Sequence, residues 1–187
     1  MRRRLGLPYM AHDIHFVLGG ARSGKSRIAE NLAFDSYKTI SSDDAQLFYM
    51  ATAQAFDDEM QARIDLHQQR RGSDWNLVEA PIDLANKIAL HDTPQAVMLV
   101  DCLSVWVTNL LIGNHDIQAE SDRLCHGLEN SKATIICVAS ETGLGIVPDN
   151  ALSRQFRDES GLLNQRVAAL ADHVYFVTAG LVSKLKP

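Results

Sequence analysis

The chain contains 187 residues, of which 46% are hydrophobic and 22% are charged, and its formal net charge is -5 at pH 7. This composition is typical of a folded globular protein, and no apolar run reaches the roughly 18 residues that a membrane-spanning helix requires. The negative charge argues against a broad nucleic-acid-binding face, because duplex binding depends on lysines and arginines that neutralise phosphates. We therefore expect neither a membrane span nor a nucleic acid partner.

The length of the chain and its cysteines indicate how many domains it has and which compartment it occupies. We expect residues 1–13 to form a loose N-terminal extension and residues 14–187 to form a single α/β domain. The basic start of the chain is followed by too short an apolar stretch for a secretory signal peptide. The three cysteines lack C-x-x-C spacing, which favours reduced, buried thiols in a cytoplasmic protein. They are Cys102, Cys125 and Cys137.

Apolar, β-branched or aromatic runs alternate along the chain with segments of helical periodicity. The predicted strands are residues 14–18, 46–50, 97–100, 134–138 and 174–178. The predicted helices are residues 25–34, 57–70, 83–90, 103–112, 119–130 and 152–171. This alternation predicts a mostly parallel sheet flanked by helices on both faces. We expect residues 181–185 to turn back as an antiparallel edge strand at the C-terminus.

A phosphate-binding loop follows the first predicted strand. Its residues match the pattern G-x-x-x-x-G-K-[ST] and are Gly19, Gly20, Ala21, Arg22, Ser23, Gly24, Lys25 and Ser26. In such a loop the glycines let backbone N–H groups face a polyphosphate, the lysine reaches the β- and γ-phosphates, and the serine hydroxyl ligates Mg²⁺. The alternative is a glycine-rich turn without a ligand. The preceding strand and the following amphipathic helix favour a nucleoside triphosphate site.

The next predicted helix, residues 57–70, carries groups with two interpretations. His67 shares a helix face with Met60 and Ile64, and by spacing alone it is either a packed core side chain or a catalytic group. Arg70 and Arg71 close the same helix, where they either bind phosphate or complement the helix dipole. Both alternatives stay open at this point.

An acidic residue, Asp101, ends the predicted strand at residues 97–100. Phosphate-loop enzymes use such a carboxylate to hold the shell of Mg²⁺. Asp101 is also placed to cap the helix that begins near residue 103, and one carboxylate could serve both purposes.

Further along the chain, residues 140–148 form a loop with two glycines and a proline after a predicted strand. Proteins with parallel sheets bind ligands in such loops, although a plain strand-to-helix connection has the same composition. The helix beyond it has a dense polar set that either faces a ligand or a neighbouring subunit or forms a solvated face. This set is Arg154, Arg157, Asp158, Asn164, Gln165 and Arg166.

Together these segments resemble the bifunctional adenosylcobinamide kinase and adenosylcobinamide-phosphate guanylyltransferase family of cobalamin synthesis, from about residue 15 to residue 186. The order and spacing of the motifs carry the resemblance. They are the phosphate loop, 49–54 (YMATAQ), 57–64 (DDEMQARI), 107–111 (VTNLL), 143–148 (GLGIVP), 156–158 (FRD), Gly161 and 164–166 (NQR).

The resemblance implies a P-loop NTPase sheet of the RecA-like class, a homotrimer and two reactions. In the first, ATP or GTP phosphorylates adenosylcobinamide. In the second, GMP passes from GTP to adenosylcobinamide phosphate through a GMP–histidine intermediate, giving adenosylcobinamide-GDP and pyrophosphate. The residue at the position of that histidine is His67. The resemblance thus favours the catalytic interpretation of this residue.

The resemblance also implies which residues contact nucleotide and metal. Beyond the phosphate loop, the implied nucleotide contacts are Ala51, Thr52, Ala53, Gln68, Gln69, Arg70, Arg71, Glu79 and Asp101. Lys25 and His67 are implied as catalytic, and Ser26 and Asp101 as the residues that bind Mg²⁺. Family members usually carry Asn and Val at the positions of Ser140 and Thr142.

Two other functions are consistent with the same loop. One is a phosphate-loop kinase for another small hydroxylated metabolite, with His67 in the core. The other is a nucleotide-sensing binding module that assembles with partner proteins. Formation of a GMP adduct would separate the bifunctional enzyme from both.

Overall fold

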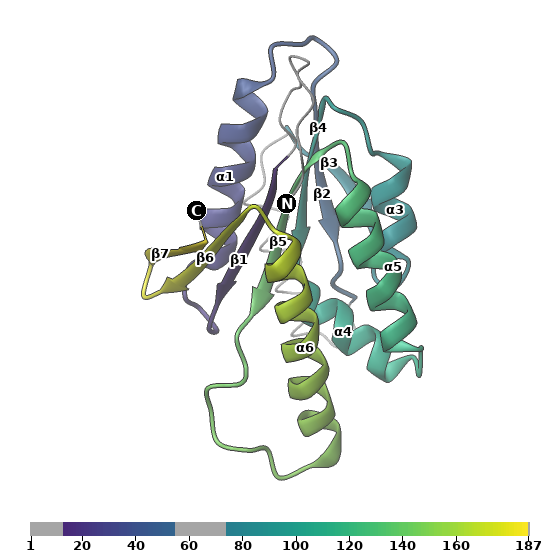
Figure 1. Cartoon of the computed structure of the whole chain (residues 1–187), viewed down its shortest axis with the longest axis vertical. Helices are drawn as coiled ribbons and strands as arrows, with labels where there is room; N and C mark the ends of the chain where they lie inside the picture. The colour runs from purple at the N-terminus through teal and green to yellow at the C-terminus, as the bar shows by residue number, and fades with distance from the viewer. Residues whose placement is uncertain (1–12, 55–73, 187) are drawn as a thin grey trace.

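The computed structural model describes residues 13–54 and 74–186, which form a seven-stranded sheet with helices on both faces (Figure 1). In chain order the elements are β1 (Ile14–Gly19), α1 (Lys25–Thr39), β2 (Gln46–Ala51), β3 (Asn76–Glu79), α3 (Leu84–Leu90), β4 (Ala96–Asp101), α4 (Leu103–Ile112), α5 (Ile117–Asn130), β5 (Thr134–Ser140), α6 (Ala151–Leu170), β6 (His173–Thr178) and β7 (Leu181–Lys186). The predicted α/β class is confirmed. The predicted helix 57–70 lies outside the described residues.

The strands follow the order β3-β2-β4-β5-β1-β6-β7. All neighbouring pairs are parallel except β6 and β7, which are antiparallel. The antiparallel C-terminal edge strand expected from the sequence is therefore confirmed. Because β5 lies between β1 and β4, the strand that leads into the phosphate loop and the strand that ends at Asp101 are separated by one strand.

Two elements differ from the sequence prediction by more than two residues. Strand β3 was not predicted, because three of its four residues are exposed and it has no apolar run that marks a strand. Helix α1 continues past residue 34 to Thr39, since Phe34 and Tyr37 pack against the core on that side of the sheet.

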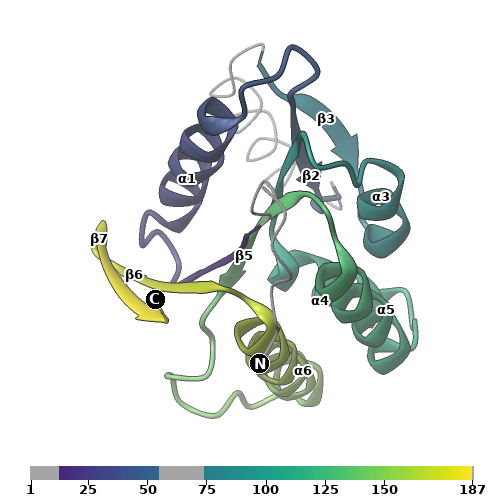
Figure 2. The ribbon, with the colours of Figure 1, turned by 45° about the horizontal axis from the view of Figure 1, so that its top comes forward.

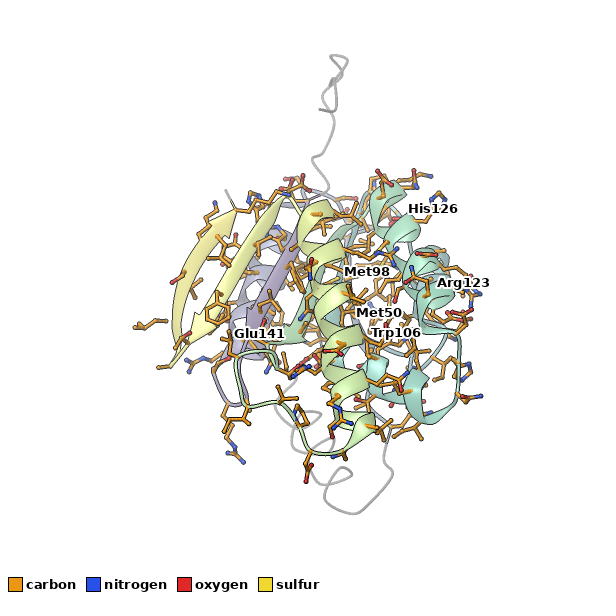
Figure 3. The ribbon with its side chains drawn as sticks, turned by 60° about the horizontal axis from the view of Figure 1, so that its bottom comes forward. Met50, Met98, Trp106, Arg123, His126 and Glu141 are labelled. Carbon is orange, nitrogen blue, oxygen red and sulfur yellow. The ribbon has the colours of Figure 1, made fainter. Side chains whose placement is uncertain are left out.

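The two faces of the sheet are covered differently (Figure 2). Helix α1 packs on one face against β1, β2, β4 and β5, over a core that includes Val17, Leu99 and Val138. Helices α3, α4, α5 and α6 cover the other face, where Met98 and Trp106 are fully buried (Figure 3). The buried residues of β1, β2, β4 and β5 alternate between the two cores, as expected of a sheet covered on both faces.

The three cysteines are free thiols. Cys125 and Cys137 are buried, and burial raises the pKa of Cys137 to about 12. None of the helices within residues 13–54 and 74–186 has the length and apolar character needed to cross a membrane.

Candidate active site

The phosphate loop connects β1 to α1 and leaves the start of that helix uncapped. Gly24, the residue before the first helical turn, has a φ of 96° and forms no side-chain cap, and Arg22 has a φ of 55°. The first N–H groups of a helix have no partner within it, so an uncapped turn offers them to an anion together with the positive end of the helix dipole. This geometry suits a bound phosphate.

Lys25 is folded back onto the loop. Its Nζ donates a hydrogen bond to the carbonyl oxygen of Gly20 at 3.2 Å. The ammonium group therefore lies against the loop backbone, close to where successive N–H groups would receive a phosphate. Ser26, the next residue, lies half-buried in the first turn of α1.

Gly19 ends β1 in a space with no room for a side chain. A methyl group there would lie 2.5 Å from Oγ of Ser23 and 2.5 Å from the carbonyl oxygen of Val177. At Gly20 nothing lies within 4 Å of the position that a methyl group would take.

We expect Gly19→Ala to lower the free energy of unfolding by about 2 kcal/mol, because overpacking has a cost of this size. Gly20→Ala should change it by less than about 0.5 kcal/mol. Equal urea midpoints for the two variants would contradict this prediction.

The carboxyl ends of the parallel strands bring the predicted site residues to one edge of the sheet. Gly19 pairs with Ser140 of β5, and the N–H of Glu141 donates to the carbonyl oxygen of Gly19 at 3.2 Å. Further along the edge, Ala51 lies between Asp101 on β4 and the exposed Glu79 on β3. Since parallel strands end at the same edge, the loop and these residues face one region.

Asp101 lies on the α1 side of the sheet, because it alternates with Val97 and Leu99, which pack in the core beneath that helix. The hydroxyl of buried Tyr49 donates to Oδ2 of Asp101 at 2.7 Å. Asp101 is not the cap of α4: the capping position is Cys102, which forms no side-chain cap bond. The tyrosine therefore orients the carboxylate at the strand end.

Lys25 and Asp101 both act on the thiol of Cys102. Burial is the largest cause that raises the pKa of Cys102 to about 12, the charge of Asp101 adds to it, and the charge of Lys25 opposes it. The two charges therefore have opposite effects on the pKa of this thiol. Cys102 stays a neutral thiol at pH 7 and is no nucleophile.

Thr52 sits just beyond β2 with no exposed surface. Its hydroxyl donates to the carbonyl oxygen of Cys102 at 2.9 Å and accepts from the N–H of Cys102 at 2.8 Å. The hydroxyl both donates and accepts a hydrogen bond, so the Thr52 side chain joins the ends of β2 and β4. Ala53, which follows it, is half-buried.

Asn109 supports the same strand ends, a role that the sequence analysis did not assign. Its side-chain amide donates to the carbonyl oxygens of Thr52 at 2.7 Å and of Pro81 at 2.9 Å. Asn109 is buried in α4, between Thr108 and apolar Leu110. A polar amide at a core position of an apolar helix is the signal that could have identified it, since buried amides require partners.

The polar set on α6 divides between internal bonds and an open hollow. Arg154 donates to the carbonyl oxygens of Pro148 and Asp149, and Arg166 pairs with Asp122 at 2.6 Å. Asn164 donates to the carbonyl oxygen of Ser140 at 3.4 Å. A hollow of about 360 Å³ lies beside these residues, and its lining is Gly143, Arg157, Asp158, Gly161, Leu162 and Gln165.

The remaining sequence-predicted site residues lie outside the described residues. They are His67, Gln68, Gln69, Arg70 and Arg71. Their interpretation rests on the sequence.

A family model described as cobinamide kinase / cobinamide phosphate guanyltransferase matches residues 15–185. The chain belongs to this family. The resemblance stated from the motifs is thereby confirmed, and the chain is a transferase with the kinase and guanyltransferase activities of the family.

Curated relatives agree with the family match over nearly their whole length. The bifunctional adenosylcobalamin biosynthesis protein CobP of Pseudomonas aeruginosa is 43% identical over 172 residues, covering 91% of this chain and 95% of its own. The bifunctional adenosylcobalamin biosynthesis protein CobU of Escherichia coli is 40% identical over 185 residues, covering 91% of this chain and 98% of its own. The CobU protein of Salmonella typhimurium is 39% identical with the same coverage.

The residues at the loop and at the end of β4 fit the Mg²⁺ that a phosphoryl-transfer family implies. Mg²⁺ prefers oxygen ligands and is held by one or two protein groups together with substrate phosphates. Ser26 provides a hydroxyl and Asp101 a carboxylate, of which Tyr49 engages only Oδ2. These side chains supply the donor chemistry that the ion requires.

Loss of the Asp101 charge should weaken catalysis without unfolding the protein. We expect Asp101→Asn to lower kinase kcat about 100-fold and to raise the Mg²⁺ concentration needed for half-maximal rate, because charge stabilisation at the phosphates depends on the metal. Tyr49→Phe keeps the carboxylate and should cost about tenfold or less. Kinase assays across a Mg²⁺ titration check both. An unchanged Mg²⁺ dependence in Asp101→Asn would refute the assignment.

Proposed function

We propose that this protein phosphorylates adenosylcobinamide with ATP or GTP and then transfers GMP from GTP to adenosylcobinamide phosphate. The proposal rests on three features that lie at one edge of the sheet. They are the uncapped phosphate loop, Lys25 bonded to the backbone of that loop, and Asp101 oriented by Tyr49. Membership of the kinase and guanyltransferase family supplies the substrate class.

In the kinase step the chain chiefly positions the nucleotide and neutralises the negative charge of its phosphates. The loop N–H groups hold the β- and γ-phosphates, and Lys25 turns from Gly20 toward them. The terminal hydroxyl of the aminopropanol arm of the corrinoid attacks the γ-phosphorus, and its proton passes to solvent. The bond from the γ-phosphorus to the β-phosphate oxygen breaks, and the nucleoside diphosphate leaves. Ser26 and Asp101 would hold Mg²⁺, which would neutralise charge on the phosphates when bound. Positioning and charge stabilisation account for most of the rate in such reactions.

In the guanylyl step His67 is the proposed nucleophile, on the strength of its position in the family motif. A neutral imidazole nitrogen attacks the α-phosphorus of GTP, forming a phosphorus–nitrogen bond and releasing pyrophosphate. A phosphate oxygen of adenosylcobinamide phosphate then attacks the same phosphorus, and the imidazole leaves. The covalent intermediate divides one difficult transfer into two easier ones. Arg70, Arg71, Gln68, Gln69 and Glu79 are proposed as further nucleotide contacts.

Product analysis tests the whole proposal. Protein incubated with adenosylcobinamide, ATP, GTP and Mg²⁺ should form adenosylcobinamide phosphate and then adenosylcobinamide-GDP, both detectable by mass spectrometry. Phosphorylation of a different hydroxylated metabolite, without guanylyl transfer, would instead support the simpler kinase. Tight GTP binding with no corrinoid-dependent turnover would support the nucleotide-sensing module.

We also propose a cytoplasmic homotrimer. Free cysteines are consistent with a reducing compartment. Leu144, Ile146 and Val147 of the loop after β5 are strongly exposed, as are Leu152 and Leu162 on α6. Apolar side chains gathered in this way favour contact with another subunit. Light scattering coupled to size-exclusion chromatography gives the number of chains per particle, and a monomer at micromolar concentration would exclude the trimer.

A further inference from the structure

Three potential metal ligands gather at the edge of the sheet opposite the phosphate loop. Asp13, His15 and His173 each offer one ligand atom, and these atoms lie within 4.8 Å of one another. His15 and His173 are register partners on the neighbouring parallel strands β1 and β6, and their rings stack with centroids 4.8 Å apart. His15 precedes Gly19 by four residues of extended strand, a separation of about 13 Å. The cluster is therefore distinct from the nucleotide site.

One nitrogen of each histidine in this cluster is unsatisfied within the described part of the chain. Nδ1 of His15 and Nδ1 of His173 are buried, and neither has a hydrogen-bond partner among the described residues. The side chain of His15 is almost wholly enclosed, with an exposed fraction of 9%. Buried polar nitrogens are normally satisfied, and an unsatisfied one is costly. Two such atoms on adjacent rings indicate a ligand that both nitrogens share.

Acidic and basic side chains lie near the histidine pair. Asp13 and Asp172 add negative charge nearby, and Lys184 adds an opposing positive charge. Asp172 is already engaged, since its Oδ2 accepts from the N–H of Ile14 at 2.9 Å. Asp13 is thus the carboxylate available to complete the set.

We propose that Asp13, His15 and His173 form a binding site for a transition-metal dication of the Zn²⁺ type. Two imidazoles and one carboxylate match the ligand preference of Zn²⁺, with water in the fourth position. A tetrahedral site holds its ligand atoms about 3.4 Å apart, so separations of up to 4.8 Å must shorten by up to about 1.4 Å. Asp13 and His173 are only half-buried, which allows their side chains to rotate for this. The metal joins the residue before β1 to the start of β6 and stabilises the folded chain.

Metal binding to untagged, chelator-treated protein tests the site. Equilibrium dialysis against Zn²⁺ in excess Mg²⁺ should give one tightly bound Zn²⁺ per chain, and Co²⁺ should give the visible absorption of a tetrahedral complex. His173→Gln and Asp13→Asn should each weaken Zn²⁺ binding about 100-fold or more. His126→Gln, which changes an exposed histidine on α5, should bind as the wild type does.

The controls separate loss of ligands from loss of fold. Zn²⁺ should raise the Tm of the wild type and of His126→Gln but not that of His173→Gln, whose Tm without metal should remain close to that of the wild type. The proposal is overturned if the wild type binds no Zn²⁺ at about 100 µM free metal, or if both ligand variants bind as the wild type does. Binding that survives in His173→Gln but disappears in Asp101→Asn would place the ion at the phosphate loop, which also overturns it.

Discussion

The His67→Ala variant is expected to form no covalent GMP adduct and to make no adenosylcobinamide-GDP, while its kinase rate stays within about threefold of the wild type. The phosphorus–nitrogen bond of the adduct requires an imidazole nitrogen, and alanine offers no nucleophile in its place. The γ-phosphoryl transfer uses the phosphate loop and does not pass through this side chain. The two activities should therefore separate in a single variant.

Labelling with α-³²P-GTP and Mg²⁺ measures the adduct directly. Label on the wild-type protein should be lost in acid and kept in alkali, as a phosphorus–nitrogen bond to histidine is. His126→Ala, at an exposed position of α5, is the matched control and should label fully. Label of equal strength on His67→Ala, or none of this type on the wild type, would exclude the covalent route and favour the simpler kinase.

The Lys25→Ala variant is expected to lose about 100- to 1,000-fold in kinase kcat/KM, because it removes a positive charge aimed at the transferred phosphate. The fold should persist, since within the described residues Nζ of Lys25 donates a single hydrogen bond, to the carbonyl oxygen of Gly20 at 3.2 Å. Lys38→Ala, which removes an exposed charge from the last turn of the same helix, is the control and should keep full activity.

Steady-state kinase assays and thermal unfolding of both lysine variants give the two readouts. Unchanged turnover in Lys25→Ala would contradict the assignment of the loop. The same variant should also label poorly with α-³²P-GTP, because we propose that one loop holds nucleotide for both reactions. Normal labelling with a lost kinase activity would instead place the second nucleotide away from Lys25.

Features encoded in short stretches of the chain were predictable. The phosphate loop is contiguous, so its glycines, lysine and serine are recognisable without knowledge of the fold, and the buried strands have continuous apolar runs. Strand β3 was missed because main-chain hydrogen bonds to β2 stabilise it. Such bonds do not require apolar side chains, and most side chains of β3 are exposed. The alternation of strands and helices was sufficient for the α/β class.

The roles of Thr52 and Asn109 were not predictable from spacing. The nucleotide contact of Thr52 stays a prediction, and the structure adds that its hydroxyl bonds both backbone groups of Cys102, a residue 50 positions away. Asn109 lies on a helix of mostly apolar residues, and its side-chain amide links the carbonyl oxygens of Thr52 and Pro81. Each role depends on which strand ends are neighbours, and that follows from the sheet order.

The sequence by itself determined the chemistry of the nucleotide loop, the α/β class and, through its ordered motifs, the family. Those properties depend on local residue types and their spacing. The tertiary structure alone decided that Tyr49 holds Asp101, that Thr52 bonds to Cys102, and that Asp13, His15 and His173 meet at the opposite edge. These groups come from strands far apart in the chain, and only the parallel pairing of β1 with β5 and β6, and of β2 with β4, brings them together.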